Sequence, residues 1–389
     1  MFPWRFRYYR VRVPCKRPGP AYRGEGAVLE IAVLGGGNGS YAAAADLADQ
    51  GCRVRFWRRD GAALRDLQGA GAITLKDYRG TRGVSLSQVT EDLGAAVRGA
   101  ALIVIPAPAF AQTDIATALA PHLVDGQVLF LPPGTFGSYV MMSALRDAGC
   151  RADVAIGETG TLPWLTRKHG PHIVAITTRA TRLPTGIFPA RLAERGLGTI
   201  KTAFPAIEPV DDALSAALMN AGPIIHPPLI LMNAGPLEHF PKWDIHKEGT
   251  QASIRRVTDA LDAERVAVRE ALGYGKPHFP LADHYSSGGE EWMYGNLAHE
   301  KLTDSGDWRE KIDLTRHRYM LEDVRFGLAF LVSVAHWAGV PAPVARGLLA
   351  LGSAVCGEDF RETGRTLENL GLSMQTGDDM ARLLREGLS

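Results

Sequence analysis

Three side chains in the second half of the chain have the chemistry needed for proton transfer and carboxylate binding. His226 stands before two prolines in "GPIIHPPLILMNAG", and because Pro suits the first position of a helix, we expect His226 near a helix N-terminus. In "HRYMLEDVRFGL", Asp323 lies near the start of a predicted helix, where its carboxylate could fix the tautomer of an imidazole. Arg318 could hold a carboxylate bidentately, or pair locally with Glu322. Spacing alone does not bring His226 to Asp323.

A glycine-rich loop near the beginning of the chain could bind phosphate groups. "VLEIAVLGGGNGSYAAAADLADQGCRVRFWRRD", residues 28–60, predicts a strand, a glycine-rich turn, a helix and a second strand. Gly35 allows the tight turn, Gly37 lets backbone N–H groups approach a pyrophosphate, and Ser40 is small where the helix packs on the strand. The partial positive charge of the helix N-terminus would face the phosphates. The loop therefore predicts a dinucleotide site, formed by Gly35, Gly37, Asn38, Gly39 and Ser40.

The end of the second strand bears on the choice of dinucleotide. An Asp or Glu roughly 20 residues after the glycines would bind the ribose 2′-hydroxyl of NAD, but here the strand ends in Arg58 and Arg59. An Arg at this place can pair with a 2′-phosphate and stack on adenine. We therefore expect NADP as the cofactor. NAD stays possible because Asp60 follows directly, and both Arg side chains could simply be solvated.

Short apolar runs alternate with helical stretches from residue 28 to about 190. Candidate strands lie at 29–34, 53–58, 102–105, 127–131 and 153–156, and candidate helices at 40–50, 62–68, 112–120 and 138–148. This alternation predicts a mostly parallel sheet with helical crossovers. Ligands bind beyond the carboxyl ends of such strands. The loops "VIPAPAF", with Pro106, and "LPPGTFGS" should therefore flank the nicotinamide.

The character of the sequence changes after about residue 200, where strand signals fade and long helical patterns appear at 252–272 and 316–338. The fold class predicted is an α/β Rossmann-type N-terminal domain with a mostly parallel sheet, followed by an all-helical C-terminal domain. We place the first domain at residues 28–195 and the second at 196–389. Residues 1–27 hold seven Lys or Arg and one Glu, and we interpret them as a basic, disordered extension.

Composition excludes several functional classes. The 389 residues carry a formal net charge of +1, so no overall field favours nucleic acid or a membrane surface. The four cysteines form no CxxC pair, which is typical of reduced thiols and predicts a cytoplasmic protein. No apolar run of about 18 residues predicts a membrane span. Exposed helical faces are compatible with a homodimer, so the oligomeric state stays undecided at this point.

Taken together, the motifs resemble those of the octopine/nopaline (opine) dehydrogenase family. The pieces that carry the resemblance include the glycine-rich unit, "VIPAPAF", "GETGTLPW", "GPIIHPPLILMNAG", "HRYMLEDVRFGL" and "GVPAP". They span nearly all of residues 28–389 in the family's order. The resemblance implies a Rossmann domain joined to a helical domain, with substrates in the cleft between them. It further implies that His226 is the catalytic histidine, Asp323 its partner, and Arg318 the side chain that holds the carboxylate of a keto acid.

Two segments depart from the family pattern, namely "PKWDIHKEGTQASI" and residues 274–315, which are rich in His, Tyr, Trp and acids. The second is expected to line or cover the substrate side, so the substrates stay open. We expect no metal site from His278, Asp283, His284 and His299, since they lack compact ligand spacing.

The reaction implied by the resemblance is NAD(P)H-dependent reductive condensation of an amino acid amine with a 2-oxo acid. The product is an N-(1-carboxyalkyl) amino acid, and the partners are these small molecules. Two alternatives remain. One is an alcohol or hydroxy-acid dehydrogenase on the same architecture, for which Lys242 is the nearest candidate but lacks the Lys-x-x-Asn spacing. The other is a non-catalytic NADP-binding protein.

Overall fold

A mostly parallel sheet forms the centre of the N-terminal part of the computed structural model, which describes residues 28–388. The strand order is β12-β11-β8-β7-β6-β1-β2-β5, and every neighbouring pair is parallel except β8 and β11. The expected extension 1–27 lies outside the described residues. The strands are β1 (Glu30–Leu34), β2 (Arg53–Trp57), β5 (Gln88–Thr90), β6 (Leu102–Val104), β7 (Val128–Leu131), β8 (Ala155–Thr159), β11 (Leu183–Phe188) and β12 (Ile207–Pro209).

The order of these strands fixes where a ligand can bind. From β1 the chain runs outward to β2 on one side and later returns to β6 on the other. The carboxyl ends of β1 and β6 therefore mark the topological switch point, the usual ligand site of an open α/β sheet. The sheet continues past residue 195, the limit expected for the first domain, because β12 pairs with β11 at its edge.

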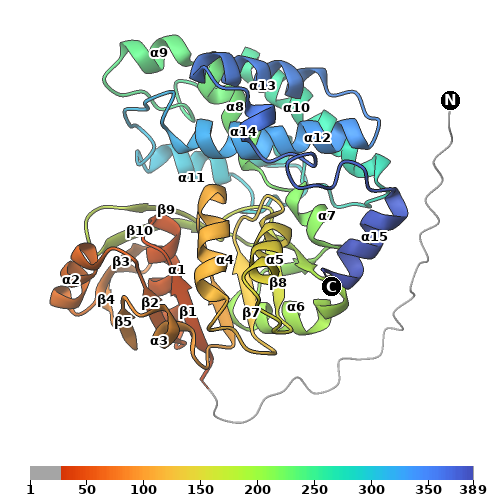
Figure 1. Cartoon of the computed structure of the whole chain (residues 1–389). Helices are drawn as coiled ribbons and strands as arrows, with labels where there is room; N and C mark the ends of the chain where they lie inside the picture. Colours follow the sequence, from red (N-terminus) through yellow and green to blue (C-terminus); the bar gives the residue numbers. More distant parts are fainter. Residues whose placement is uncertain (1–27, 389) are drawn as a thin grey trace.

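Helices cover both faces of this sheet (Figure 1). Side chains of β1 alternate between two cores: Ile31 and Val33 pack on one face, Ala32 and Leu34 on the other. This alternation follows from the two-residue period of a strand. The helices are α1 (Asn38–Asp49), α2 (Gly61–Ala70), α3 (Leu93–Val97), α4 (Gln112–Leu119), α5 (Gly137–Asp147) and α6 (Ala193–Ala203), with short 3₁₀ turns η1 (Ala109–Ala111) and η2 (Ala190–Leu192).

A second sheet, which the sequence patterns did not predict, packs beside α1. Its order is β4-β3-β10-β9, made of β3 (Ile73–Asp77), β4 (Gly80–Val84), β9 (Trp164–Lys168) and β10 (Ile173–Arg179). Asp46 of α1 ties the layers together: it accepts hydrogen bonds from the Trp164 indole at 2.8 Å and the Arg179 guanidinium at 2.6 Å. β10 lies within the segment "IVAITTRATRL", residues 173–183.

The regular elements after β12 are helices, which confirms the predicted fold class. They are α7 (Ala213–Ala217), α8 (Gly222–Met232), α9 (Ala234–His239), α10 (Ala252–Ala271), η3 (Leu281–Tyr285), α11 (Ala298–Asp304), the π-helix η4 (Tyr319–Leu328), α12 (Ala329–Trp337), α13 (Pro343–Cys356), α14 (Phe360–Thr363) and α15 (Gly377–Glu386). The helix expected at 316–338 is thus a π-helix followed by an α-helix.

The helical domain sits on the sheet domain through a shared core (Figure 1). Met141 of α5 and Leu328 of η4 belong to one hydrophobic cluster. Buried Arg365 adds a polar tie, because its guanidinium donates to the Thr135 carbonyl at 2.6 Å and to Gln112 at 2.8 Å. These contacts hold the loops after β6 and β7 against the segment that follows α14.

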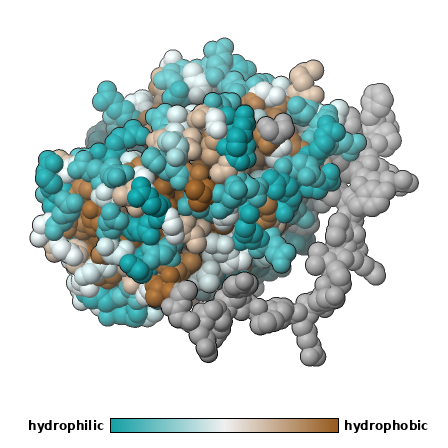
Figure 2. All heavy atoms as spheres, turned by 60° about the horizontal axis from the view of Figure 1, so that its bottom comes forward, coloured by the Kyte–Doolittle hydropathy of each residue, from teal (hydrophilic) through white to brown (hydrophobic). Residues whose placement is uncertain are grey.

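The surface seen in Figure 2 is mostly polar, and one long apolar stretch is mostly buried. Figure 2 shows a face on which hydrophilic and smaller hydrophobic areas alternate. In the described residues one stretch, Ala213–Leu231, is long and apolar enough for a membrane span by length and composition, and 78% of it is buried inside the protein. A buried core helix has the same composition, so this is weak support for a span.

Candidate active site

His226 and Asp323 lie side by side in the cleft between the two domains. The His226 Nδ1 atom is 2.7 Å from an oxygen of the Asp323 carboxylate, and the Asp323 side chain is only 6% exposed. Because the carboxylate accepts, Nδ1 carries the proton and Nε2 is left for a substrate. The structure thus brings together the pair that spacing alone could not join.

The prediction that the helix begins at the prolines after His226 was wrong. His226 lies in the second turn of α8, and Pro227 and Pro228 are inside the helix. The helix begins one turn earlier, at Gly222, and Pro223 occupies the early position at which Pro needs no N–H partner.

Two glycines allow α8 and η4 to approach each other closely. A Cβ atom on Gly222 would lie 2.2 Å from the Asp323 carboxylate, and one on Gly327 would lie 2.1 Å from the Pro223 ring. Side chains at either position would push the helices apart. The close approach is what places Asp323 within hydrogen-bond distance of His226.

Arg318 faces a cavity of about 140 Å³ that His226 and Asp323 also line. Its side chain is exposed to this space, lies near the Tyr319 ring, and forms no hydrogen bond or ion pair with any of residues 28–388. The local pair with Glu322 considered from the sequence is not formed, because Glu322 accepts from the Ala109 backbone N–H at 2.6 Å. Arg318 is therefore a free cation next to a histidine–aspartate pair, suited to a carboxylate.

The glycine-rich loop has the geometry of a phosphate cradle. Gly35 has a φ of +118°, which only glycine adopts readily. Gly37 precedes α1, has open space around its Cα, and caps the helix with no side chain. Backbone N–H groups of the first turn are therefore free for a pyrophosphate. A Cβ on Gly39 would lie 3.0 Å from Pro106, so the loop after β6 closes the other side.

Ser40 and Asn38 hold this loop in place. The Ser40 hydroxyl donates to the Leu34 carbonyl at 3.3 Å, and the Asn38 side chain accepts from the Lys168 backbone N–H at 3.0 Å. The residues present thus fit a dinucleotide, with Asn38 and Ser40 shaping the turn and glycine N–H groups facing the phosphates.

Arg58 lies over the glycine-rich loop and pairs with Asp60 at 3.4 Å. A Cβ on Gly36 would lie 2.7 Å from the Arg58 guanidinium, which also donates to the Tyr41 hydroxyl at 3.2 Å. Asp60 caps α2 by accepting from the N–H groups of residues 62 and 63. Arg59 is exposed at the strand end.

Comparisons with known proteins agree with this geometry. Residues 209–356 match the model of the family "NAD/NADP octopine/nopaline dehydrogenase, alpha-helical domain", and residues 30–131 match "NAD-dependent glycerol-3-phosphate dehydrogenase N-terminus". The opine dehydrogenase of Arthrobacter sp. (strain 1C) is 32% identical over 352 residues, which cover 88% of this chain and 95% of the relative. The chain belongs to the octopine/nopaline dehydrogenase family. It is an NAD(P)-dependent oxidoreductase.

Other relatives of this opine dehydrogenase family member extend the likeness. The vitopine synthase of Allorhizobium ampelinum is 28% identical, covering 88% of this chain and 95% of the relative. An octopine dehydrogenase structure in complex with NADH and agmatine has a TM-score of 0.70 at 19% identity, covering 93% of this chain and 99% of that one. A yersinopine dehydrogenase structure with NADP⁺ has a TM-score of 0.64 at 15% identity, covering 92% and 98%. These structures show the shared fold.

Several residues of the opine dehydrogenase cleft were missed by the sequence analysis. The Tyr319 ring stacks on His226 with centroids 3.9 Å apart, and its hydroxyl accepts from Arg167 at 3.4 Å. Arg167 also pairs with Glu310 at 3.0 Å. Asn220 lines the cavity and accepts from the Gly222 N–H at 3.1 Å. These residues come from segments that are far apart in the sequence. Only Tyr319 could have been found from the sequence, because it lies in the same motif as Asp323.

Glu322 contacts the sheet domain, while its neighbour Asp323 faces the cavity. Its second carboxylate oxygen is buried without a hydrogen-bond partner among the described residues. Burial raises the pKa of Glu322 to about 7, and the adjacent Asp323 carboxylate adds to the rise. Glu322 thus belongs to the contact between the domains.

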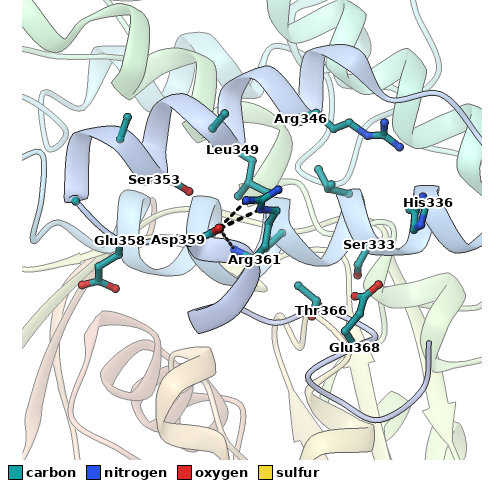
Figure 3. Close-up of a pocket in the computed structure, with 15 residues that line it drawn as sticks. Ser333, His336, Arg346, Leu349, Ser353, Glu358, Asp359, Arg361, Thr366 and Glu368 are labelled. Atoms are coloured by element: carbon teal, nitrogen blue, oxygen red, sulfur yellow. Dashed lines mark hydrogen bonds and ion pairs between the residues drawn. The ribbon is translucent and has the colours of Figure 1, made fainter. Parts of the chain in front are cut away.

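A larger hollow of about 860 Å³ lies apart from this cleft, between α12, α13 and the segment around α14 (Figure 3). Its polar groups include Asp359 and Arg361, which pair with each other at 2.6 Å. No glycine-rich loop or histidine–aspartate pair opens into it. In residues 28–388, no three His, Cys, Asp or Glu side chains gather as a metal site.

Proposed function

We propose that His226, Asp323 and Arg318 are the reacting group, its positioning partner and the substrate anchor of an opine dehydrogenase reaction. In this reaction the amine of an amino acid and the carbonyl of a 2-oxo acid form an imine with loss of water. Reduction then gives an N-(1-carboxyalkyl) amino acid. The observation that carries the proposal is the free Arg318 guanidinium across one small cavity from the His226–Asp323 pair.

Arg318 would bind the carboxylate of the 2-oxo acid with two parallel N–H donors and so fix its carbonyl carbon in the cleft. His226 would take a proton from the attacking amine at Nε2 and pass it to the carbonyl oxygen, which leaves as water. Asp323 would keep Nδ1 protonated and stabilise the imidazolium. The nicotinamide, when bound by the residues of the glycine-rich loop, supplies the hydride that reduces the imine carbon.

The decisive experiment omits one component at a time from a nicotinamide oxidation assay with amino acids and 2-oxo acids. Oxidation that needs both an amine and a keto acid supports the proposal, and oxidation with the keto compound alone supports the plain dehydrogenase alternative. His226→Ala should lose nearly all turnover with little change in cofactor affinity. The matched control is His239→Ala, which alters an exposed histidine at the end of α9. Native turnover in His226→Ala would refute its role.

We further propose that NADPH is preferred to NADH. Arg58 over the loop, exposed Arg59 and nearby Lys168 make this end of the site positive, which favours a 2′-phosphate. Lys168 lies 3.7 Å over the Tyr41 ring, and burial, then the charge of Arg58, lower its pKa. Asp60, as a helix cap, is less available to a ribose hydroxyl.

The cofactor preference is tested by the ratio of kcat/KM with NADPH and NADH. Arg58→Gln should lower this ratio about tenfold or more, since a charged hydrogen bond to phosphate is lost. Arg53→Gln at the start of β2, with a largely exposed side chain, should leave it unchanged. A native ratio that favours NADH would refute the preference.

We also propose a homodimer formed through α13 and a cytoplasmic location. Leu351 and Val355 of α13 are 57% and 40% exposed, and the adjacent hollow carries charges of both signs, which allows self-complementary pairing. Light scattering should give a dimer that Leu351→Glu converts to a monomer; a native monomer would contradict this.

Support for the cytoplasmic location comes from the free thiols of Cys52, Cys150 and Cys356, and cell fractionation tests it.

A further inference from the structure

Two buried histidines form part of the cavity wall without taking part in the proposed proton transfer. His246 and His284 both line the cavity that contains His226 and Arg318, and each is only 2% exposed. Neither nitrogen of either ring has a hydrogen-bond partner in residues 28–388. A buried imidazole without a partner is costly. This arrangement indicates that a ligand supplies the missing hydrogen bonds.

These two histidines come from the two segments that depart from the family pattern. His246 lies in "PKWDIHKEGTQASI", and His284 lies within 274–315. The same long segment supplies further cavity residues that are aromatic or apolar. They are Trp292, Tyr294, Leu302 and Trp308. This wall therefore comes from segments outside the family motifs, and its mixed aromatic and polar lining is suited to a substrate side chain.

The charges around the cavity do not favour a cationic side chain. The carboxylate of Asp323 is paired with His226, and Arg167 is paired with Glu310. Arg318 is unpaired and positive. No other acidic residue lines the cavity. A guanidinium or ammonium group placed here would meet positive charge and find no free carboxylate.

The histidines themselves stay uncharged at neutral pH. Burial lowers the pKa of His284 to about 3, with a contribution from His299 and Arg255. Burial also lowers the pKa of His246 well below its ordinary value, with a contribution from His226. A neutral imidazole offers one N–H donor and one acceptor nitrogen. The Arg167 guanidinium carbon lies 4.9 Å from the centroid of the Trp308 ring. This face of the ring is therefore already occupied and cannot stack on a substrate cation.

We propose that His246 and His284 form the subsite for the side chain of the amino donor, and that this subsite selects an uncharged side chain with a hydrogen-bonding group. The inference rests on the proposed reaction and adds its substrate class. Side chains with a neutral hydroxyl, amide, urea or imidazole group fit this description, and the cationic side chains of arginine and lysine do not.

Donors matched in shape test the charge part of the inference. Citrulline and arginine differ little in shape but differ in charge, and threonine and valine differ in one hydroxyl. We expect kcat/KM for citrulline to exceed that for arginine by about tenfold or more, because an unpaired buried charge is strongly disfavoured. Threonine should exceed valine by about tenfold, since a site built to hydrogen-bond a hydroxyl rejects its apolar analogue. Arginine equal to or better than citrulline would overturn the proposal.

The His284→Phe variant tests the assignment of the histidine. The threonine-to-valine ratio should fall to about one or below, because the ring is kept and its hydrogen-bonding atoms are removed. Tyr285→Phe is the control, since Tyr285 neighbours His284 but does not line the cavity, and it should keep the native ratio. A native ratio in a folded His284→Phe protein would remove His284 from the subsite.

Calorimetric titration of the same donors into the wild-type protein with NADPH separates two kinds of failure. If citrulline binds more tightly than arginine but no donor is turned over, the subsite stands and the proposed reaction fails. If donors are turned over with arginine preferred, the reaction stands and the subsite fails. Equal binding of both donors would refute the charge selection independently of turnover.

Discussion

Replacing Gly222 with Ala should separate Asp323 from His226 without changing either residue. Gly222 begins α8, and its backbone does not have a positive φ, so Ala can adopt the conformation. The added Cβ would lie 2.2 Å from an Asp323 oxygen, whereas ordinary contact begins near 3.4 Å. Asp323 or its helix must therefore move by about 1 Å.

The expected loss follows from this displacement. The Asp323–His226 bond is 2.7 Å long, and a shift of about 1 Å would take it beyond hydrogen-bond distance. A misplacement of about 1 Å in an active site can cost roughly 100-fold in rate, which corresponds to about 2.7 kcal/mol of transition-state stabilisation. We expect a loss of this size in kcat/KM.

The assay measures kcat/KM for both substrates together with cofactor affinity and thermal unfolding. Gly235→Ala is the matched control, because Gly235 lies in α9 and its added Cβ would meet nothing within 4 Å. It should keep native kcat/KM and gain up to about 1 kcal/mol from helix propensity. If Gly222→Ala folds, binds the cofactor and retains native kcat/KM, the His226–Asp323 contact does not position the reacting group.

Three other substitutions test the cleft and the contact between the domains. Asp323→Asn should lower kcat/KM about 10²–10⁴-fold by removing the charge that supports the His226 imidazolium, measured by nicotinamide oxidation. Burial raises the pKa of Glu322 from 4.5 to about 7, so protonation of Glu322 stabilises the fold at low pH. Up to about 3 kcal/mol of the free energy of unfolding is lost as the pH rises through 7. Glu322→Gln should reduce this pH dependence, measured by urea unfolding. Arg365→Met should lower the unfolding free energy by about 3 kcal/mol, because it leaves buried acceptors unpaired; an unchanged urea midpoint would contradict this.

The cofactor half of the molecule could be predicted well because its signals are local. The strand, turn and helix around Gly35 are consecutive in sequence, and the switch point follows from their alternation with later strands. The second sheet was missed because β3 and β10 are far apart in sequence and pair only in the folded chain. Its strands are short, and their buried side chains belong to the same hydrophobic cluster as α1, which forms only in the folded chain.

The substrate half could be predicted only in part, for a different physical reason. His226 and Asp323 were identified as chemical groups, but their contact depends on the close packing permitted by Gly222. The roles of His246 and His284 depend on buried nitrogens without partners, a property of three-dimensional packing that leaves no sequence pattern. Arg167 lies on β9 of the unpredicted sheet, so its place in the cleft could not be inferred.

The π-helical form of η4 gives a reason why Arg318 and Asp323 can serve one substrate. Five residues separate them, and in an α-helix at 3.6 residues per turn their directions would differ by about 140°. In η4, Tyr319–Leu328 is π-helical, with hydrogen bonds from each residue to the fifth along the chain. A π-helix has more residues per turn than an α-helix, so the directions of residues five apart differ less than they would in an α-helix. This widened turn lets Arg318 and Asp323 line one cavity, while Glu322 reaches the Ala109 N–H of the sheet domain.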